Sequence, residues 1–508
     1  MTTSNKVTEK MSQREFWVRT IVGLVLAAAS AVLLTLAFAP YNLWLLIWIG
    51  FIPGLLAQYR IMPRRIAWLA TGVFVGGFVL GYLGPVFVDG IWYMKYLWLI
   101  IGVIAALANI GAIAFQERTH YRWFILQGAV IWVAIEMIRN FIPVAGTWGY
   151  LAYSLYKQPW LIQPVSIFGI FGLSLLILLV NYSLALGALA LYDRFWPKDD
   201  RVPVQFSLAT RWLIGVSVVA VAWTGLSLVL FRTPDTPTVR VAAIQLARPP
   251  SPSFSSPEEF RQFLENDWKR LIDDSREAAA QGAQLIVWPE EALPFDPQVN
   301  HTEELRALTA DTGAYLVMGY NVMTEKGRRN EVTILTPDGE FLGVYGKEHP
   351  TYMRGEESIT GGTFPTYDTS LGTLGTVICF DFAFTDSARE VVANGAQLIA
   401  APSWDWPAIA DKNYAHPLFR AVENRVSIVK ADAAHDSAII DPYGRIIDLV
   451  VIAPQPGRAT LVADVPLGTA NAPQTRLGDW VGWIALAGLV FFIALDVVTA
   501  RREKRGDE

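Results

Sequence analysis

Residues 374–381 read LGTVICFD, a run of small and apolar residues that ends in Cys379, an aromatic residue and a carboxylate. The run predicts a short apolar strand over residues 376–380. Cys379 is the only cysteine among 508 residues, so an internal disulfide and a thiolate zinc site are both excluded. Two interpretations remain. A lone cysteine is most often a small buried hydrophobe, whereas a nucleophile at a strand end requires a base and a charge stabiliser from elsewhere in the chain.

Two other strand ends carry residues that fit those roles. Glu290 follows the apolar run 284–288, where a strand gives way to a loop, and such ends collect functional side chains in α/β sheets. A solvated carboxylate is the ordinary alternative, and the neighbouring Glu291 competes for the role. Lys347 closes another candidate strand, in YGKEH. It is either a solvated lysine at a sheet edge or an ammonium that stabilises an oxyanion and activates a thiol.

The composition divides the chain into two kinds of sequence. Hydrophobic residues make up 53% of the chain and charged residues 17%, and the apolar excess lies in residues 17–231 and 480–498. The sequence between them has ordinary globular composition, so we expect a membrane protein that carries an extramembrane domain. The net charge of −5, without a basic stripe, argues against nucleic acid as a partner. Five scattered histidines and the lack of a nucleotide-binding loop predict no metal and no cofactor.

Eight stretches approach the ~20 apolar residues that a helix needs to cross a hydrocarbon core about 30 Å thick. They are residues 18–38, 43–58, 66–88, 95–115, 123–139, 162–191, 212–231 and 480–498. Every second loop is basic. The basic residues are Lys6, Lys10, Arg14, Arg19, Arg60, Arg64, Arg65, Arg118, Arg122, Arg194, Lys198, Arg201, Arg211, Arg501, Arg502, Lys504 and Arg505. The opposite loops carry mainly Lys95 and Lys157, which predicts that both termini are cytoplasmic and that the domain before the eighth span is outside.

Two further patterns stand out in the membrane part. Glu136 and Arg139, three residues apart near the end of the fifth span, predict a mutual ion pair. Residues 141–160, FIPVAGTWGYLAYSLYKQPW, form an outer loop rich in aromatic residues. An interfacial aromatic belt explains this loop, which would also suit a lipid-facing entrance beside the extramembrane domain.

A polar, proline-rich linker at residues 232–238 marks a domain boundary. We expect a membrane domain of seven helices at 1–231, a catalytic domain at 239–470, and a final helix with a basic tail at 471–508. Short apolar strands alternate with amphipathic helices inside the catalytic domain, which predicts an α/β fold with helix-covered sheets. The expected strands are 239–246, 284–288, 314–320, 376–380, 397–401, 427–431, 437–441, 445–449 and 459–463, with a hairpin formed by 331–336 and 341–345. The expected helices are 257–281, 301–312, 387–394 and 414–424.

Glu290 in VWPEEALP, Lys347 in YGKEHPTYMRGE and Cys379 in VICFD resemble, in order and spacing, the Glu-Lys-Cys set of the nitrilase, or carbon-nitrogen hydrolase, superfamily. Three more segments are similar to membrane motifs of the bacterial apolipoprotein N-acyltransferases, namely those at 36–44, 146–174 and 475–480. The resemblance covers nearly the full length. It implies a multi-domain fold, a polytopic α-helical membrane domain of about eight spans plus a nitrilase-like αββα sandwich.

The resemblance also implies a two-step acyl transfer. Glu290 would take the proton of Cys379, and the thiolate would attack an acyl ester of a membrane phospholipid while Lys347 and a backbone N–H hold the oxyanion. The thioester would then pass its acyl chain to the α-amine of the diacylglyceryl-cysteine at a lipoprotein N-terminus. The implied partners are a phospholipid donor, a lipoprotein acceptor and membrane lipid. The implied location is the bacterial inner membrane, with the catalytic domain in the periplasm.

Further site residues come from the same resemblance. Glu356 corresponds to a second glutamate that supports the lysine and the nucleophile. Phe380 and Asp381 stand where the family has Tyr and Glu, so they are expected supporting residues with altered substrate contacts. The expected substrate-binding residues are Ser403, Trp404 and Asp405.

Two other functions stay open at this point. In a membrane-anchored amidase or hydrolase of the same superfamily, water rather than an amine would resolve the thioester. In a non-catalytic binding module the fold would remain without the chemistry, and the intact Glu290, Lys347 and Cys379 speak against that. Aromatic residues around Met353 and at 404–406 suit a lipid acceptor, although packing in a core or an interface explains them as well.

Overall fold

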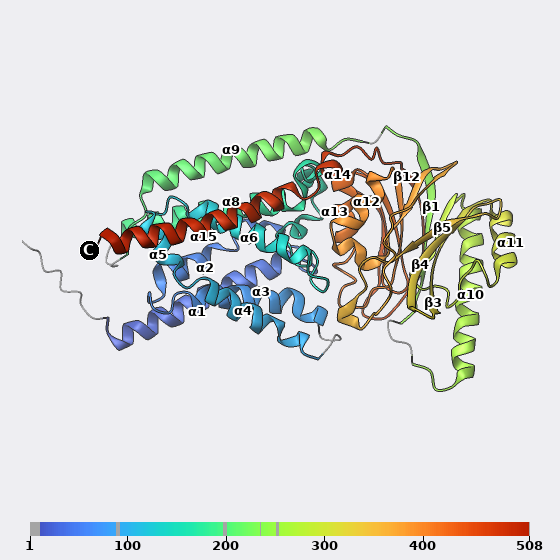
Figure 1. The fold of residues 1–508 in the computed structure, drawn as a ribbon, viewed down its shortest axis with the longest axis horizontal. Coiled ribbons are helices and arrows are strands. Elements are labelled where there is room, and N and C mark those ends of the chain that lie inside the picture. Colours follow the sequence, from blue (N-terminus) through green and yellow to red (C-terminus); the bar gives the residue numbers. More distant parts are fainter. Residues whose placement is uncertain (1–10, 88–91, 197–200, 234, 250–252, 507–508) are drawn as a thin grey trace, which may run out of the picture.

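The computed structural model describes residues 11–87, 92–196, 201–233, 235–249 and 253–506. A helical bundle and a layered strand domain lie end to end (Figure 1). Lys6, Lys10 and Lys198, part of the charge pattern above, lie outside the described residues, as do Pro234 of the linker and residue 88 of the third expected span.

The eight expected spans correspond to eight helical stretches among the described residues. Seven are long and apolar enough to cross a membrane. They are α1 (Gln13–Ala37), the run η1–α2–η2 (Trp44–Trp48, Ile52–Leu56 and Ala57–Ile61), α3 (Leu69–Phe87), the run η3–α4–α5 (Met94–Tyr96, Leu97–Ala108 and Ala112–Arg118), α8 (Val165–Phe195), α9 (Phe206–Leu230) and α15 (Trp480–Gly506). The eighth, α6 (Phe124–Asn140), has 17 residues and packs against α8 and α15.

The ion pair predicted between Glu136 and Arg139 is wrong. Glu136 accepts a hydrogen bond from the Leu151 N–H at 3.1 Å. Arg139 donates to the Trp148 carbonyl, and its guanidinium lies 5.4 Å from the centre of the Tyr150 ring. Both side chains therefore bind the outer loop, which folds back over the end of α6 and offers partners that spacing along one helix cannot reveal.

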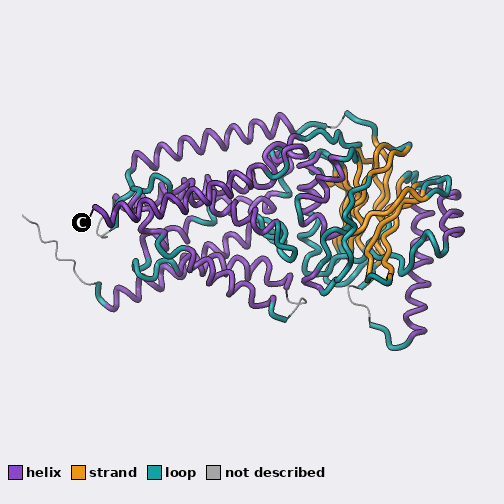
Figure 2. The backbone as a smooth tube through the Cα atoms, viewed as in Figure 1, coloured by secondary structure: helices purple, strands orange, loops and turns teal. Residues whose placement is uncertain are grey.

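Two six-stranded sheets form the centre of the strand domain (Figure 2). The first, in the order β12-β1-β2-β3-β4-β5, contains β1 (Thr238–Leu246), β2 (Leu285–Val287), β3 (Tyr315–Thr324), β4 (Gly327–Leu335), β5 (Phe341–Gly346) and β12 (Arg458–Pro466). The second, in the order β11-β10-β9-β8-β7-β6, contains β6 (Thr366–Thr369), β7 (Gly372–Thr376), β8 (Leu398–Ser403), β9 (Ser427–Asp432), β10 (Asp436–Ile440) and β11 (Ile446–Val451). Strands β1, β2 and β3 run parallel, as do β7, β8 and β9.

Helices cover the outer face of each sheet. α10 (Pro257–Ala280) and α11 (Thr302–Thr312) cover the first sheet, on the side away from the bundle (Figure 1). α12 (Asp386–Ala393) and α13 (Ala415–Asn424) cover the second and face the bundle, next to the short α14 (Pro473–Leu477). This arrangement is the expected αββα sandwich. Because parallel strands end at the same edge, the loops after β2, β7 and β8 are brought to one site.

Candidate active site

Cys379 lies in a tight turn rather than at the end of a strand. β7 ends at Thr376, and Cys379 begins the 3₁₀ helix η6 (Cys379–Ala383), so the strand predicted over 376–380 is wrong. The chain turns because the Asp381 N–H donates to the Ile378 carbonyl at 2.9 Å and Asp381 Oδ2 accepts from the Ile378 N–H at 3.2 Å. Cys379 itself has φ of +40°, a conformation that costs a non-glycine residue on the order of 1–3 kcal/mol and recurs at functional sites.

Lys347 lies between two carboxylates beside this turn. Its Nζ donates to Glu290 Oε1 at 2.8 Å and to Glu356 Oε2 at 2.7 Å, and the lysine is 2% exposed. Asn330 Nδ2 links the same carboxylates, at 2.7 Å from Glu290 and 3.0 Å from Glu356. The structure therefore brings together the predicted Glu290, Lys347 and Glu356, and adds Asn330.

The competition between Glu290 and Glu291 is resolved by their partners. Glu291 pairs with Arg328, accepts from Asn321 Nδ2 at 3.0 Å and lies 3.4 Å from Asn330 Nδ2. Of these two neighbours, Glu290 makes an ion pair with Lys347, and Glu291 makes none with it in the described part of the chain.

The end of β8 forms another wall of the site. Cys379 Sγ lies 3.5 Å from Asp405 Oδ1, and both Asp405 oxygens accept from Asn413 Nδ2, at 2.8 and 2.7 Å. The carbonyl of Ser403 accepts from the Glu290 N–H at 3.3 Å. Hence Ser403 fixes the backbone of Glu290, while the carboxylate of Asp405 is already engaged by protein groups.

Of the three residues expected to bind substrate, only Trp404 has an incompletely buried side chain. Ser403 and Asp405 are fully buried, whereas Trp404 is half-buried with the Arg248 guanidinium 5.7 Å from its ring centre. The indole N–H of Trp404 is buried without a hydrogen-bond partner in the described part of the chain.

Asp381 ties the cysteine turn to the lysine loop. Its Oδ1 accepts from the His349 N–H at 2.7 Å, and its Oδ2 accepts from the Tyr345 hydroxyl at 2.7 Å. Both partners lie two residues from Lys347. Phe380, the other expected supporting residue, is buried and packs in the core.

Burial and neighbouring charges set the protonation states. Burial raises the pKa of Glu290 to about 7, against the opposing effect of Lys347. Burial, followed by the charges of Glu290 and Asp405, raises the pKa of the Cys379 thiol well above its usual value, and Lys347 opposes this. Burial also acts on Glu356, but the lysine ammonium and hydrogen bonds prevail and lower its pKa to about 2. At neutral pH the resting thiol is therefore protonated beside a carboxylate that is about half ionised.

Two groups of carboxylates have the spacing of metal ligands, and the ammonium of a buried lysine lies among the carboxylates of each group. The groups are Glu290, Glu291 and Glu356, and Asp405, Asp432 and Asp436. Lys347 binds two members of the first. Lys430 Nζ lies 2.9–3.4 Å from all three members of the second. These lysines give both groups the geometry of ion-pair networks.

Sequence reasoning missed Asn330, Asn413 and Lys430. A signal for Asn330 existed, because continuing the predicted β4–β5 hairpin by one pair places it beside Lys347, whose N–H donates to the Asn330 carbonyl at 2.9 Å. For Asn413 and Lys430 there was no comparable signal. Both reach Asp405 from separate segments, a loop before α13 and the strand β9.

The outer loop of the membrane domain is hydrogen-bonded to the last residue of the cysteine turn. The N–H and the Oγ1 of Thr147 both donate to the carbonyl of Ala383, the last residue of η6, at 2.7 and 2.8 Å. His416 of α13 lies between the rings of Trp148 and Tyr153, at 4.5 and 4.4 Å between centres. These aromatic residues are buried against the catalytic domain, so the aromatic-belt interpretation is wrong for this part of the loop.

Comparison with known proteins agrees with this architecture. Residues 30–183 match the Apolipoprotein N-acyltransferase N-terminal domain, and residues 240–473 match the Carbon-nitrogen hydrolase family. The chain is 27% identical to the apolipoprotein N-acyltransferase of Geobacter metallireducens, over 93% of this chain and 94% of that protein.

Two further comparisons match less than half of the chain. A nitrilase of Pyrococcus abyssi is 33% identical, over 38% of this chain and 74% of that protein. The crystal structure of an amidase from Nesterenkonia sp. aligns with a TM-score of 0.36 and 22% identity, over 45% of this chain and 90% of that chain. The sequence matches show that the chain belongs to the carbon-nitrogen hydrolase family and, within it, to the membrane-embedded apolipoprotein N-acyltransferases.

Proposed function

We propose that this chain transfers a fatty acyl group from a membrane phospholipid, through a thioester on Cys379, to the α-amine of the N-terminal diacylglyceryl-cysteine of a lipoprotein. The observation that carries the proposal is the convergence of a thiol, a carboxylate and an ammonium from the loops that follow three strands, in a domain joined to apolar helices. Cys379, Glu290 and Lys347 are the proposed catalytic residues.

In the first half-reaction Glu290 accepts the proton of Cys379 as the sulfur attacks the ester carbonyl of the phospholipid. The S–C bond forms and the C–O bond breaks, and the proton on Glu290 passes to the departing lysophospholipid. The charge on the carbonyl oxygen is stabilised by Lys347 and by the N–H of Phe380, the residue after the cysteine. A carboxyl group with a pKa of about 7 suits both proton transfers at neutral pH.

In the second half-reaction the lipoprotein α-amine attacks the thioester. The N–C bond forms, the S–C bond breaks, and Glu290 moves the amine proton to the leaving sulfur. The products are the amide and the free thiol, so the enzyme returns to its starting state. Both substrates are lipids that diffuse in the membrane, which accounts for a catalytic domain joined to a bundle of spans.

The supporting residues have separate parts in this scheme. Glu356 and Asn330 position Lys347 and Glu290 through the hydrogen bonds described above. Asp381 fixes the distance between the cysteine turn and the lysine loop. Among Ser403, Trp404 and Asp405, we assign substrate contact to Trp404, since it alone keeps exposed side-chain surface.

The test is acyl transfer by the purified full-length protein in phospholipid vesicles with a diacylglyceryl-cysteine peptide. Mass spectrometry should show the N-acylated peptide and, without peptide, an acyl adduct on Cys379 that is absent from Cys379→Ser. Release of free fatty acid without peptide acylation would overturn the proposal in favour of a membrane-anchored hydrolase. In cells, loss of the gene should remove N-acylation from lipoprotein N-termini.

A further inference from the structure

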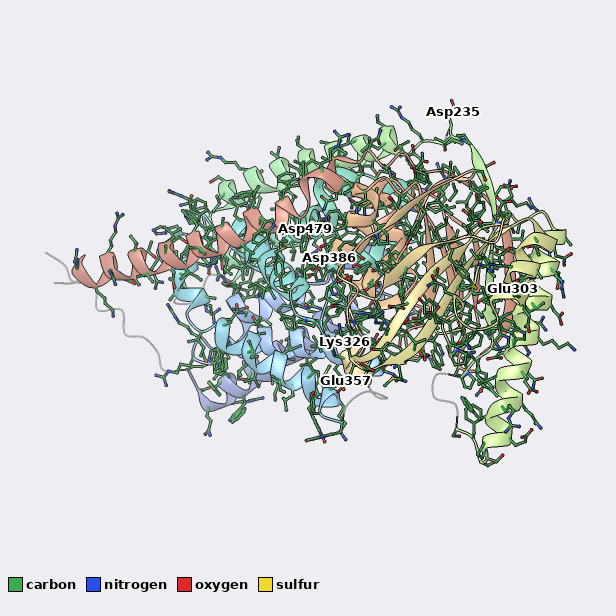
Figure 3. The ribbon with its side chains drawn as sticks, turned by 45° about the vertical axis from the view of Figure 1, so that its right-hand side comes forward. Asp235, Glu303, Lys326, Glu357, Asp386 and Asp479 are labelled. Atoms are coloured by element: carbon green, nitrogen blue, oxygen red, sulfur yellow. The ribbon has the colours of Figure 1, made fainter. Side chains whose placement is uncertain are left out.

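A cavity of about 310 Å³ lies at the joint between the bundle and the catalytic domain, apart from the cysteine site. α6, α12, α14 and the start of α15 supply its lining. Asp386 and Asp479, both of which line it, lie close together at this joint in Figure 3. No proposed catalytic residue lines the cavity.

Two arginines that line this cavity have guanidinium donors without partners in the described structure. Arg476 is exposed and has no hydrogen-bond or ion-pair partner among the described residues. The Nε of Arg389 is buried without a partner, although its Nη1 pairs with Glu390 at 3.0 Å. A ligand that satisfies two guanidinium groups is an anion with several acceptor oxygens.

The carboxylates of the cavity, in contrast, are satisfied by the protein. Asp479 accepts from the Thr385 hydroxyl at 2.5 Å and from Gln474 Nε2 at 3.2 Å. Asp386 accepts from His349 Nε2 at 3.0 Å. The two carboxylates of the cavity therefore have donors from the protein, whereas the Arg476 side chain and the Nε of Arg389 keep free donors for a ligand in the described structure.

The mouth of the cavity is aromatic and faces the apolar surface of the bundle. Phe141 and Trp483 are 58% and 57% exposed, and their ring centres are 5.7 Å apart. They stand where α6 ends and α15 begins, beside the catalytic domain (Figure 1). Exposed aromatic residues at this level are typical of the boundary between lipid and water. This setting fits an anion that carries apolar chains.

We propose that this cavity binds the phosphodiester headgroup of a membrane phospholipid, with Arg389 and Arg476 on the phosphate and the acyl chains beside Phe141 and Trp483. Arginine is suited to phosphate because its planar fork donates two parallel hydrogen bonds. The bound lipid would border the catalytic loop, because Asp386 in the cavity wall binds His349, two residues from Lys347. The site does not depend on acyl transfer by this chain.

The test measures lipid binding to the full-length Cys379→Ser protein in detergent by native mass spectrometry, so that turnover cannot consume the lipid. The probes are dioctanoyl phosphatidylglycerol, dioctanoylglycerol, which lacks the phosphate, and glycerol 3-phosphate, which lacks the chains. We expect Arg389→Gln/Arg476→Gln to weaken phosphatidylglycerol binding at least tenfold. The matched control is Arg232→Gln, an exposed arginine just past α9 at the same end of the bundle, and it should change nothing.

The single variant Arg476→Gln controls for misfolding of the double variant, because Arg476 is exposed and lacks partners in the described structure. Arg476→Lys should restore part of the binding. Equal affinity of the double variant and its parent for phosphatidylglycerol would overturn the proposal. So would an equal loss of dioctanoylglycerol binding, since that would show a site for chains alone. Glycerol 3-phosphate binding as tightly as the lipid would assign the cavity to a soluble phosphate instead.

Discussion

Cys379 lies between two networks of buried lysine and carboxylate groups. On one side Lys347 pairs with Glu290, and on the other Lys430 pairs with Asp405. Burial and the two carboxylates favour the neutral thiol, whereas Lys347 favours the thiolate. A sulfur that stays protonated at rest and loses its proton only during attack is less exposed to oxidation and alkylation, which act on the thiolate.

The rate of acyl-enzyme formation should therefore follow the ionisation of Glu290. Its carboxyl group must be deprotonated to act as a base, and its pKa is about 7. The rate is expected to rise with pH, to reach half its maximum near pH 7, and to fall tenfold per pH unit well below that. Intact-protein mass spectrometry after rapid quenching from a phospholipid donor measures this directly.

Glu290→Gln is the control for that profile. It should lower the rate by ~10²–10⁴-fold and abolish the limb near pH 7. If the rate of acyl-enzyme formation in Glu290→Gln still rose with pH near 7, the titrating group would be another residue. That result would contradict Glu290 as the base.

Alkylation of the single cysteine should respond in opposite directions to its two charged neighbours. Asp405→Asn removes a negative charge 3.5 Å from the sulfur, so the thiol pKa should fall and iodoacetamide should react about tenfold faster for each unit of decrease. Lys347→Met removes the stabilising ammonium and should slow the reaction. Both variants should react like the parent in denaturant. Changes in the same direction for both variants would show altered access rather than altered charge.

The contact between the outer loop and η6 offers a test of how the membrane domain positions the nucleophile. Gly146 and Gly149 both have positive φ, +48° and +74°. A Cβ at Gly146 would lie 2.6 Å from the Ala383 carbonyl oxygen, whereas at Gly149 the nearest atom would be 3.5 Å away, on Tyr82. Alanine therefore carries the same type of backbone strain at both positions, but only at Gly146 does it push against the end of the cysteine turn.

Gly146→Ala is accordingly expected to slow acyl-enzyme formation at least tenfold more than Gly149→Ala does. The thermal unfolding midpoints of the two variants should stay similar, since the strain that they share is similar. Equal rates for both variants would mean that the loop braces the fold without setting the position of Cys379.

The sequence predicted the elements well wherever local pattern decides. The strands β1, β8, β9 and β10 and the helices α10 to α13 agree with their predicted ranges within about two residues. The failures have two physical causes: a nearby side chain that overrides periodicity, and a folded-back segment that supplies other partners. The apolar VICF was read as strand, but Asp381 closes it into a turn. The spacing of Glu136 and Arg139 suggested a pair, but a folded-back loop binds both.

The candidate site shows the same limit. Glu290, Lys347 and Cys379 were predictable because each follows a strand within three residues, and the apolar runs of those strands are visible in the sequence. Asn413 and Lys430 were not, because neither ends a strand at the site; Asn413 comes from a loop and Lys430 from within β9, and they meet only through Asp405.

On the scale of the whole molecule, charge is distributed along the long axis. The start of α1 and the end of α15 lie at the end of the bundle opposite the strands (Figure 1). Basic side chains of that end make ion pairs with neighbouring helix ends, such as Arg60 with Asp193 of α8 and Arg64 with Glu117 of α5. Cytoplasmic loops of membrane proteins are rich in Lys and Arg, so this end should face the cytoplasm.

Topology in the cell is therefore predictable and can be measured with the one native cysteine removed. In the Cys379→Ser protein, a cysteine at Val299, which is 74% exposed on the catalytic domain, should react with a membrane-impermeant maleimide in intact spheroplasts. A cysteine at Arg501, exposed in the basic tail, should react only after permeabilisation, because the positive-inside rule holds that tail in the cytoplasm. The reverse pattern would place the catalytic domain in the cytoplasm. A cytoplasmic catalytic domain could not meet lipoprotein N-termini on the outer side. That result would contradict the proposed lipoprotein acceptor, even if Cys379 still formed a thioester.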